Sequence, residues 1–380
     1  MNKRKIKTDF LIVGAGFYGS ILAERIANVL KKNVLIIDKR NHFGGNCYSE
    51  IDDKTGILYH KYGTHIFHTS NKRVWNYIKN FTEFNSYRHQ VLSVYKNKIY
   101  QMPINLETIN SFFNKNFRPK DAEKFLKQIT KKHTKKSYNN FEDKALCQIG
   151  EKLYKAFVKN YTIKQWNQNP RKLPASIFNR LPIRFNYNED YFNRCNWQGM
   201  PIDGYTEIFR RILSNKRIKF VKNNFYKLND DYDVKYLTIF TGPLDKLFNN
   251  KFGELKWRSL KFIKEIKNIG DYQGTSVVNY PELNYKYTRI HEPRHLHKER
   301  NYKNNKTLIM KEYPILNSTE PYYPVNDNEN RDLHRKYIKM AEKIPKFEFG
   351  GRLSDYAYYD MDMTMSAALK KFDKILKNFS

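Results

Sequence analysis

The architecture follows from one N-terminal segment, which reads Asp9-Phe10-Leu11-Ile12-Val13-Gly14-Ala15-Gly16-Phe17-Tyr18-Gly19. An apolar run that ends in glycines is typical of a buried parallel strand, and residues 19–31 continue with helical periodicity. In such a unit the first glycine permits a tight turn, the second lets the backbone approach a pyrophosphate, and the third lets the helix pack on the strand. The helix N-terminus then offers its free N–H groups to the phosphates. The segment therefore predicts a strand–turn–helix unit that binds a dinucleotide.

A second strand and three short motifs identify the expected dinucleotide. Residues 34–38 form another apolar run that ends on Asp38, where an acid accepts hydrogen bonds from an adenosine ribose. The later motifs are Gly44-Gly45, Thr241-Gly242-Pro243 and Gly350-Gly351-Arg352. In this order they resemble the FAD signatures of flavin amine oxidases and their relatives. We therefore expect FAD rather than NAD as the cofactor.

The composition excludes several other classes of protein. The 380 residues are 40% hydrophobic and 16% aromatic, which is too apolar for a disordered polybasic chain despite a net charge of +32. No run approaches the roughly 20 apolar residues that span a bilayer, so we expect no transmembrane segment. The three cysteines are too far apart for a disulfide framework or a cysteine-rich zinc site. They are Cys47, Cys147 and Cys195.

The positive charge allows two other interpretations, nucleic-acid binding and membrane-surface binding. The lysines are spread along the whole chain without a nucleic-acid-binding motif, so we expect no nucleic-acid partner. A basic surface equally attracts a diphosphate substrate or an anionic membrane face. The basic N-terminus resembles a signal peptide, but Asp9 and the glycines interrupt its apolar run, so we expect a cytoplasmic protein.

The rest of the chain divides by its pattern of apolar residues. From about residue 105 to 180 the pattern is helical and lysine-rich, most clearly over residues 121–132 and 141–159. Short strand-like segments follow, and residues 365–377 form a closing helical pattern. The strand-like segments are residues 217–221, 235–240, 275–280, 307–311 and 346–349. No flexible linker separates these parts, so we expect interleaved rather than sequential domains.

Further motifs narrow the flavin interpretation to one family. In chain order they are His60-Lys61-Tyr62-Gly63-Thr64-His65-Ile66-Phe67-His68-Thr69, Tyr161-Thr162 followed by Lys164-Gln165-Trp166, Leu173-Pro174-Ala175, Arg180-Leu181-Pro182-Ile183-Arg184-Phe185, Tyr287-Thr288-Arg289, Glu320-Pro321-Tyr322-Tyr323-Pro324-Val325-Asn326-Asp327 and Tyr358-Tyr359-Asp360-Met361. The chain resembles the bacterial UDP-galactopyranose mutases in these motifs, from about residue 8 to the C-terminus. An amine oxidase would share only the FAD motifs.

The resemblance implies an α/β fold with a Rossmann-like FAD-binding domain, an inserted helical domain and an antiparallel β-sheet domain. The expected boundaries are residues 1–83, 203–245 and 340–380 for the FAD-binding domain, 106–179 for the helical domain, and 84–105, 180–202 and 246–339 for the sheet domain that binds substrate. The resemblance also implies a homodimer and an external reductant such as NADPH, because the family's FAD is active when reduced.

The family's reaction converts UDP-galactopyranose to UDP-galactofuranose without net redox, for cell-surface polysaccharide synthesis. Reduced flavin N5 attacks the anomeric carbon and displaces the nucleotide diphosphate, which gives a covalent flavin–sugar adduct. The adduct opens and recloses before the diphosphate returns. The cofactor is thus the nucleophile, and the protein supplies position and charge.

The resemblance assigns three catalytic residues. Arg180 and Arg289 would clamp the diphosphate, because guanidinium groups bind such oxygens bidentately and do not lose their charge. Arg184 is the local rival of Arg180, and His65 would lie near the flavin ring. The spacing of His65 and His68 also suggests a metal site, but no third ligand accompanies them, so we expect no metal.

The remaining site residues are implied by the same motifs. Expected substrate contacts are His68, His89, Phe157, Tyr161, Thr162, Trp166, Arg184, Tyr191, Asn279, Tyr323 and Tyr358. Expected cofactor contacts are Gly14, Gly16, Tyr18, Gly19, Asp38, Lys39, Gly45, Asn46, His65, Ile66, Asn223, Asn224, Thr241, Arg352, Tyr359, Asp360 and Met361. Phe157, Tyr161 and Trp166 fall on one helical segment, so they could equally form its core stripe.

Three departures from the family pattern leave the sugar open. Asn167 stands where a glycine is usual, Thr64 where proline or alanine is common, and residues 195–199 replace a shorter stretch. His68 favours a plain hexose, because an acetamido group needs a donor that a long arginine supplies more readily. We expect UDP-galactose first, another nucleotide-linked hexose such as dTDP-fucose second and UDP-N-acetylgalactosamine third. The remaining alternative is an amine-oxidase-type oxidoreductase, which would need an electron acceptor.

Overall fold

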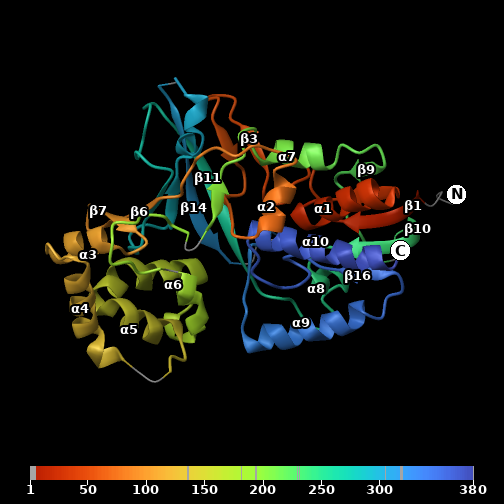
Figure 1. Ribbon diagram of the computed structural model, residues 1–380. Helices are drawn as coiled ribbons and strands as arrows, with labels where there is room; N and C mark the ends of the chain where they lie inside the picture. Colours follow the sequence, from red (N-terminus) through yellow and green to blue (C-terminus); the bar gives the residue numbers. More distant parts are fainter. Residues whose placement is uncertain are drawn as a thin grey trace.

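The computed structural model describes three regions that meet in one molecule (Figure 1). It covers residues 6–134, 137–180, 182–192, 195–228, 230, 232–303, 305–316 and 320–379, without the side chains of Asn179 and Arg180. A parallel sheet with flanking helices lies on the right of the figure, a larger sheet in the centre and a group of helices at the lower left.

The parallel sheet has five strands and is buried on both faces. Its order is β16 (Phe347–Phe349), β10 (Tyr232–Phe240), β1 (Ile6–Val13), β2 (Val34–Ile37) and β9 (Ile218–Val221). Phe10 and Ile12 pack with α1 (Phe17–Arg25) and α10 (Met361–Lys377) on one face. Leu11 and Val13 pack with α9 (Asn328–Ala341) on the other. This two-sided cover explains why the strands are uninterrupted apolar runs, and it confirms the expected Rossmann-like α/β fold.

The placement of α9 corrects one expected boundary. We expected the sheet domain to continue to residue 339 and the FAD-binding domain to resume at 340. Tyr337 and Ala341 of α9 instead share a core with Leu11 and Leu35 of the parallel sheet. The whole helix therefore belongs with the parallel sheet, because its apolar face is buried there.

The central sheet has seven strands. Its order is β15 (Tyr323–Pro324), β11 (Trp257–Lys267), β14 (Thr307–Ile315), β13 (Arg289–His291), β12 (Val277–Asn279), β6 (Val91–Tyr95) and β7 (Lys98–Met102). The described neighbours pair antiparallel except β12 and β6, which pair in parallel. The sheet is therefore mixed at that one position, where strands remote in sequence meet.

The helical region has its own core. It contains α3 (Leu106–Phe113), α4 (Pro119–Thr130), α5 (Phe141–Leu153), a π-helical segment (Tyr154–Lys159) and α6 (Asn160–Trp166). The helix expected over residues 141–159 is interrupted at Gly150, whose φ of +74° is not helical. A Cβ atom there would lie 3.2 Å from Ile129, so the chain passes α4 closely at this kink. Leu126, Ile149 and Phe178 are buried in the core.

Shorter elements connect these regions. β3 (Ser49–Ile51) pairs with β4 (Leu58–His60), and β5 (Phe67–Thr69) pairs with β8 (Trp197–Gly199). The remaining α-helices of the described residues are α2 (Lys72–Ile78), α7 (Tyr205–Ile212) and α8 (Leu244–Leu247). Within the described residues, no helix is both long enough and apolar enough to cross a membrane.

Candidate active site

Two glycines of the first turn are required by close contacts. Gly14 has a φ of +108°, and a Cβ atom there would lie 2.0 Å from Oγ1 of Thr241. A Cβ atom at Gly19 would lie 2.0 Å from the carbonyl oxygen of Gly14. Thr241 donates its hydroxyl hydrogen to the carbonyl of Val13 at 2.8 Å. The ends of β1 and β10 and the start of α1 therefore meet with no room for side chains, as the sequence predicted.

Gly16 has a different surrounding, which suits a ligand. Its φ is an ordinary −77°, and an added Cβ atom would approach only Gly45, at 3.9 Å from Cα. The backbones of the two glycine turns thus face each other beside the N-terminus of α1. This bare cradle is what a pyrophosphate requires.

Asp38 fixes the two glycine turns relative to each other. Its Oδ2 accepts a hydrogen bond from Ala15 N at 2.8 Å, and its Oδ1 accepts one from Arg40 N at 2.9 Å. The backbone N–H groups of Asn223 and Asn224 donate to the carbonyls of Arg40 and Asp38. The structure therefore gives Asp38 a bracing role beyond the expected ribose contact.

The other expected cofactor residues near this turn form a charged cluster. The Lys39 ammonium lies 3.2 Å from a Glu320 carboxyl oxygen, and Arg40 also pairs with Glu320. Arg40 further donates to the side-chain oxygen of Asn46 at 2.8 Å. Glu320 comes from the central sheet region, so these contacts connect the cradle to that sheet.

Tyr18 is buried against the late glycine pair. A Cβ atom at Gly350 would lie 2.2 Å from the Tyr18 hydroxyl oxygen, and one at Gly351 would lie 3.0 Å from its ring. Burial, aided by Asp355, raises the pKa of Tyr18. The glycine pair thus accommodates a tyrosine of α1, whereas we had interpreted it only as a cofactor motif.

Arg352 follows the glycine pair and lies beside two tyrosines. Its guanidinium carbon is 5.1 Å from the ring centre of Tyr323 and 5.3 Å from that of Tyr358. The two rings are stacked, with centres 5.2 Å apart and planes 7° apart. Arg352 donates to the carbonyl of Tyr322, but its buried Nε has no partner among the described residues. A donor of this kind is available to a ligand.

Arg289 lies in a row of polar residues across the central sheet. Glu312, Arg289, Asn279 and Ser93 are direct neighbours in the strand pairing, so their side chains share one face. Nη1 of Arg289 is 3.8 Å from Oε2 of Glu312. Its guanidinium carbon is 5.6 Å from the ring centre of Tyr161 on α6. The row therefore faces the helical region.

Glu312 is the site residue that our sequence reasoning missed. It is buried and accepts hydrogen bonds from His291 Nε2 at 3.0 Å and Thr288 Oγ1 at 3.1 Å. Burial opposes its charge, but Arg289 and His291 lower its pKa to about 2. The sequence signal for this residue is a carboxylate that directly follows the apolar strand-like run of residues 307–311. A charged side chain that is buried in a strand is normally paired with an opposite charge.

Arg289 remains charged, and part of its hydrogen-bonding capacity is unused. Burial opposes the cation, but Tyr161, Glu312 and the nearby Tyr191 and Tyr323 raise its pKa. Three buried polar atoms at this place have no partner among the described residues. They are Nε of Arg289, Oδ1 of Asn279 and the hydroxyl of Tyr161. Unpaired buried polar groups are costly, so their convergence indicates a polar ligand.

Tyr323 connects the Arg289 row with the cofactor side. Its hydroxyl lies within electrostatic reach of Arg289, Arg352 and Tyr358, and burial raises its pKa. Four expected site residues are thus brought together from distant parts of the chain. Tyr323 thus links the Arg289 row with Arg352, the residue that follows the late glycine pair.

The three expected histidines are held by nearby backbone and aromatic groups. His65 Nδ1 lies 2.6 Å from the carbonyl of Gly63, and burial, aided by the charge of Arg352, lowers its pKa to about 4. His89 is buried with Nδ1 3.0 Å from the Tyr87 hydroxyl, and burial lowers its pKa. His68 stacks on the ring of Phe192, with centres 3.6 Å apart. His65 and His89 are therefore neutral at pH 7.

Three of the expected cofactor contacts lie at the start of α10. Asp360 precedes the helix, and its carbonyl accepts from Thr364. Burial and Asp355 raise the pKa of Tyr359 to about 12. Met361 packs against the core that also contains the expected residue Ile66. The helix N-terminus therefore begins beside expected cofactor contacts.

Other expected residues lie outside this cluster. Phe157 is buried in the helical core against Tyr95, Tyr100 and Phe112, with ring centres 5.1 to 5.8 Å apart. Trp166 packs beside the same core, and Thr162 is buried. Phe157 thus has the packing role that we gave as its alternative.

Arg180 and Arg184, the two arginines expected near the diphosphate, are described to different extents by the structure. Arg184 donates to the carbonyls of Asn188, Asp190 and Phe192, so its guanidinium holds this loop. These contacts give Arg184 a role in the loop itself, and its expected contact with substrate stays a prediction. The side chain of Arg180, the expected clamp, lies outside the described residues.

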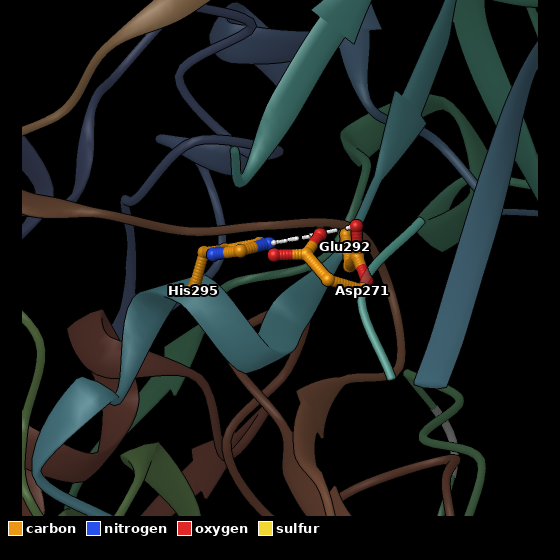
Figure 2. Close-up of side chains that lie close together, drawn as sticks. All are labelled: Asp271, Glu292 and His295. Atoms are coloured by element: carbon orange, nitrogen blue, oxygen red, sulfur yellow. Dashed lines mark hydrogen bonds and ion pairs between the residues drawn. The ribbon is translucent and has the colours of Figure 1, made fainter. Parts of the chain in front are cut away.

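One acidic cluster resembles a metal site but is already satisfied. Figure 2 shows Asp271, Glu292 and His295 with their polar ends directed toward one another. The carboxylate of the buried Glu292 accepts hydrogen bonds from the backbone N–H groups of Tyr272 and Gln273 and from Thr307 Oγ1. His295 Nε2 lies 3.1 Å from Asp271, and the two acids raise the pKa of His295 against the effect of burial. The cluster is an ion-paired brace for the 271–275 turn.

The fold defines a class, the flavin-dependent enzymes that combine a Rossmann-like sheet with a second, larger sheet. The family model for UDP-galactopyranose mutase matches residues 156–358, and that for the NAD(P)-binding Rossmann-like domain matches residues 12–81. The chain belongs to the UDP-galactopyranose mutase family, and it is an isomerase with a flavin cofactor.

Individual relatives cover almost the whole chain. A Klebsiella pneumoniae protein named "Probable UDP-galactopyranose mutase" is 38% identical over 100% of this chain and 96% of its own length. The dTDP-fucopyranose mutase of Escherichia coli is 37% identical over 97% of this chain and 98% of its own length. The crystal structure of a reduced UDP-galactopyranose mutase has the same fold, with a TM-score of 0.78 over 97% of this chain and 94% of that one at 15% identity.

Proposed function

We propose that this enzyme interconverts the pyranose and furanose forms of a nucleotide-linked hexose, with UDP-galactopyranose as the first candidate. The observation that carries the proposal is the Arg289 row, where a permanent cation lies beside the ring of Tyr161 and where Oδ1 of Asn279 and the Tyr161 hydroxyl are buried without a partner. A diphosphate supplies acceptor oxygens for Nε of Arg289 and the hydroxyl of Tyr161, and a sugar hydroxyl can donate to Oδ1 of Asn279. The row therefore suits a nucleotide diphosphate that leaves and returns during turnover.

We propose FAD as the flavin. The facing backbones of Gly16 and Gly45 and the N-terminus of α1 fit its pyrophosphate, and Nε of Arg352 is a further donor beside the tyrosine pair. When bound and reduced, the flavin supplies the nucleophile for the anomeric carbon, which explains why the chain needs no nucleophile of its own. An external reductant such as NADPH and a homodimer are part of this proposal and rest on the family resemblance.

The chain's own residues supply charge and orientation. Arg289 binds the diphosphate and stabilises the negative charge that develops as the sugar departs. Glu312 and Tyr161 hold this guanidinium from two sides. His65 keeps its proton on Nδ1, beside the carbonyl of Gly63, and therefore presents Nε2 as an acceptor.

The second candidate substrate is dTDP-fucose. It is favoured by the nearly equal identity to the dTDP-fucopyranose mutase, 37% against 38%. His68 stacks flat on Phe192 and offers no long donor, which favours either plain hexose over a 2-acetamido sugar. The two sugar nucleotides differ at C6 of the hexose, in the base and at C2′ of the pentose, and none of these differences is determined by the Arg289 row.

The test is turnover of a substrate panel by the dithionite-reduced, FAD-loaded enzyme. UDP-galactofuranose, dTDP-fucofuranose and UDP-N-acetylgalactosaminofuranose are assayed by chromatography for conversion to the pyranose. We expect conversion only with reduced flavin, no net consumption of reductant, and the highest kcat/KM for UDP-galactofuranose. Equal activity with oxidised flavin would contradict the mechanism, and preference for the acetamido sugar would contradict the role of His68.

Substitution of Arg289 gives the sharpest variant. We expect Arg289→Ala to lower kcat/KM about 100- to 1,000-fold with flavin still bound, because a preorganised cation is lost where charge develops. The matched control is Arg73→Ala, since Arg73 pairs with Asp373 on the surface of the molecule. Near-normal turnover in Arg289→Ala would remove Arg289 from the site.

A further inference from the structure

The ammonium group of Lys164 on α6 is surrounded by backbone carbonyl oxygens of a single loop. Its Nζ donates to the carbonyls of Glu282 at 2.9 Å, Tyr285 at 3.0 Å and Tyr287 at 2.9 Å, and also to that of Tyr280. Four acceptors thus converge on three N–H groups. This arrangement is closer to the coordination of a small cation than to a surface lysine.

The loop that Lys164 binds carries site residues at both ends. It covers residues 280–288, and it begins directly after Asn279 and ends directly before Arg289. Tyr161, whose ring lies against Arg289, is on α6 three residues before Lys164. One side chain therefore connects the helix that bears Tyr161 with the loop between Asn279 and Arg289.

The Lys164 ammonium is the common donor to the carbonyls of this loop, while the rings of Tyr280, Tyr285 and Tyr287 pack on one another with centres 4.9 to 5.6 Å apart. A hydrogen bond of 2.8 Å from Tyr280 N to Thr288 O closes the two ends of the loop. Within the loop, the hydrogen bond from Tyr285 N to Glu282 O is long, at 3.4 Å. The Glu282 side chain points elsewhere, since it accepts from the backbone N–H of Lys96. Without a cation, four carbonyl dipoles directed at one point would repel each other and lose their hydrogen bonds.

An ammonium at this place carries a free-energy cost that its contacts must offset. Burial lowers the pKa of Lys164 to about 8, against the favourable effect of the Glu282 carboxylate. Partial burial of an ammonium is costly, and an apolar side chain of the same length would avoid that cost but would leave the four carbonyls without their donor. The charge is explained if the site needs the loop in one fixed conformation.

We propose that Lys164 is a positioning residue for the sugar-nucleotide reaction, whose ammonium fixes the 280–288 loop to α6 so that Tyr161, Asn279 and Arg289 address one substrate. The inference rests on the proposed function. Lys164 acts through these three residues and does not itself contact the substrate.

The experiment removes the side chain and returns its charged end as a small molecule. Lys164→Ala deletes three methylene groups and the ammonium, which together have the size of propylammonium. In the FAD-loaded, reduced protein we expect kcat/KM to fall at least 10-fold with an unchanged flavin spectrum. We expect propylammonium to restore activity at least 5-fold, and tetramethylammonium at equal ionic strength, which has no N–H donor, to restore none.

Two further variants keep the test decisive. Lys155→Ala is the matched control, because Lys155 is an exposed lysine shortly before α6 that pairs with Glu151. Lys164→Met preserves the volume of the side chain, and we expect it to fold and bind flavin but to have the same low kcat/KM. This variant also covers the case in which Lys164→Ala does not fold.

The outcomes separate this inference from the proposed function. If the wild-type enzyme and Lys155→Ala turn over no sugar nucleotide, the proposed function fails first. If both are active and Lys164→Met is equally active, only the positioning role is overturned. A propylammonium effect no larger than that of tetramethylammonium would also overturn it.

Discussion

Glu312 shows how a single buried carboxylate holds the site together. It accepts hydrogen bonds from His291 and Thr288 and lies beside the Arg289 guanidinium. These groups favour its ionised form strongly enough to outweigh burial, so its pKa falls to about 2. The same contacts orient Arg289, so charge pairing here serves both stability and geometry.

The depressed pKa of Glu312 predicts a pH-dependent stability. The carboxylate binds protons more weakly in the folded than in the unfolded chain, so its contribution is complete above about pH 4.5 and is lost as the pH falls toward 2. We expect about 3 kcal/mol of the free energy of unfolding to disappear across this window. The measurement is urea unfolding at pH 6 and at pH 3.

Glu312→Gln isolates this contribution from those of other acids. The variant should be less stable at pH 6, and between pH 6 and pH 3 it should lose about 2 kcal/mol less than the wild type. Glu329→Gln is the control, because Glu329 and its ion-pair partner Lys256 are both exposed, so that their pairing contributes little to stability. Parallel pH profiles for Glu312→Gln and the wild type would exclude this role.

Single residues differed in how well the sequence predicted them. Gly14 and Gly19 were predictable, because the strand–turn–helix motif that needs them is local in sequence, even though the contact at Gly14 comes from the distant Thr241. Glu312 was not, because its partners are set by strand register rather than by a local motif. Phe157 was ambiguous, since an aromatic residue on a helix serves a core or a site equally well.

At the scale of elements, the end of α6 explains one departure from the family pattern. Asn167 terminates this helix with a φ of +46°, in the left-handed region. Asparagine adopts this conformation more readily than other residues with a side chain, which is why it replaces the usual glycine. The departure therefore preserves the backbone and carries no information about the sugar.

This cap predicts a specific order of stabilities. We expect Asn167→Gly to change the free energy of unfolding by only a few tenths of a kcal/mol, and Asn167→Ala to cost about 1 kcal/mol, because alanine is strained at this φ. Chemical denaturation of both variants is the measurement. An alanine variant as stable as the glycine variant would show that the left-handed cap is absent.

Elements with a local signal were predicted well, and those defined by packing were not. The strands of the parallel sheet appear as apolar runs because both faces are buried. β11 was missed, since lysines on its exposed positions obscure the alternation. The helix expected over residues 141–159 is broken at Gly150, where the close approach of α4 overrides helical propensity.

At the scale of the whole molecule, the cofactor cradle separates folding from ligand binding. Gly19 is required for packing, whereas an added Cβ atom at Gly16 meets only Gly45, at 3.9 Å. The backbone at Gly16 is therefore bare of side chains without any packing contact that requires it. A flavin that occupies the cradle should stabilise the native state by mass action, by about 2.7 kcal/mol at 100 times its Kd.

Alanine substitutions at Gly16 and Gly19 test whether the residue that faces the ligand is distinct from the residue that the fold requires. We expect the Tm of the flavin-free protein to be unchanged in Gly16→Ala and lowered in Gly19→Ala, where the Cβ atom would collide with the backbone at 2.0 Å. Added FAD should raise the Tm of the wild type but raise that of Gly16→Ala much less. An equal FAD-induced shift in Gly16→Ala would place the pyrophosphate elsewhere.

The return of the chain to its first sheet has a consequence for how the protein is made. β1 pairs with β10, and the ring centres of Phe10 and Phe379 are 5.6 Å apart. The native contacts of β1 therefore include residues that are synthesised much later. The helices of residues 106–178 share a core from one contiguous stretch. On the ribosome, this middle stretch can become compact first, while β1, synthesised before it, waits for the final helix to emerge.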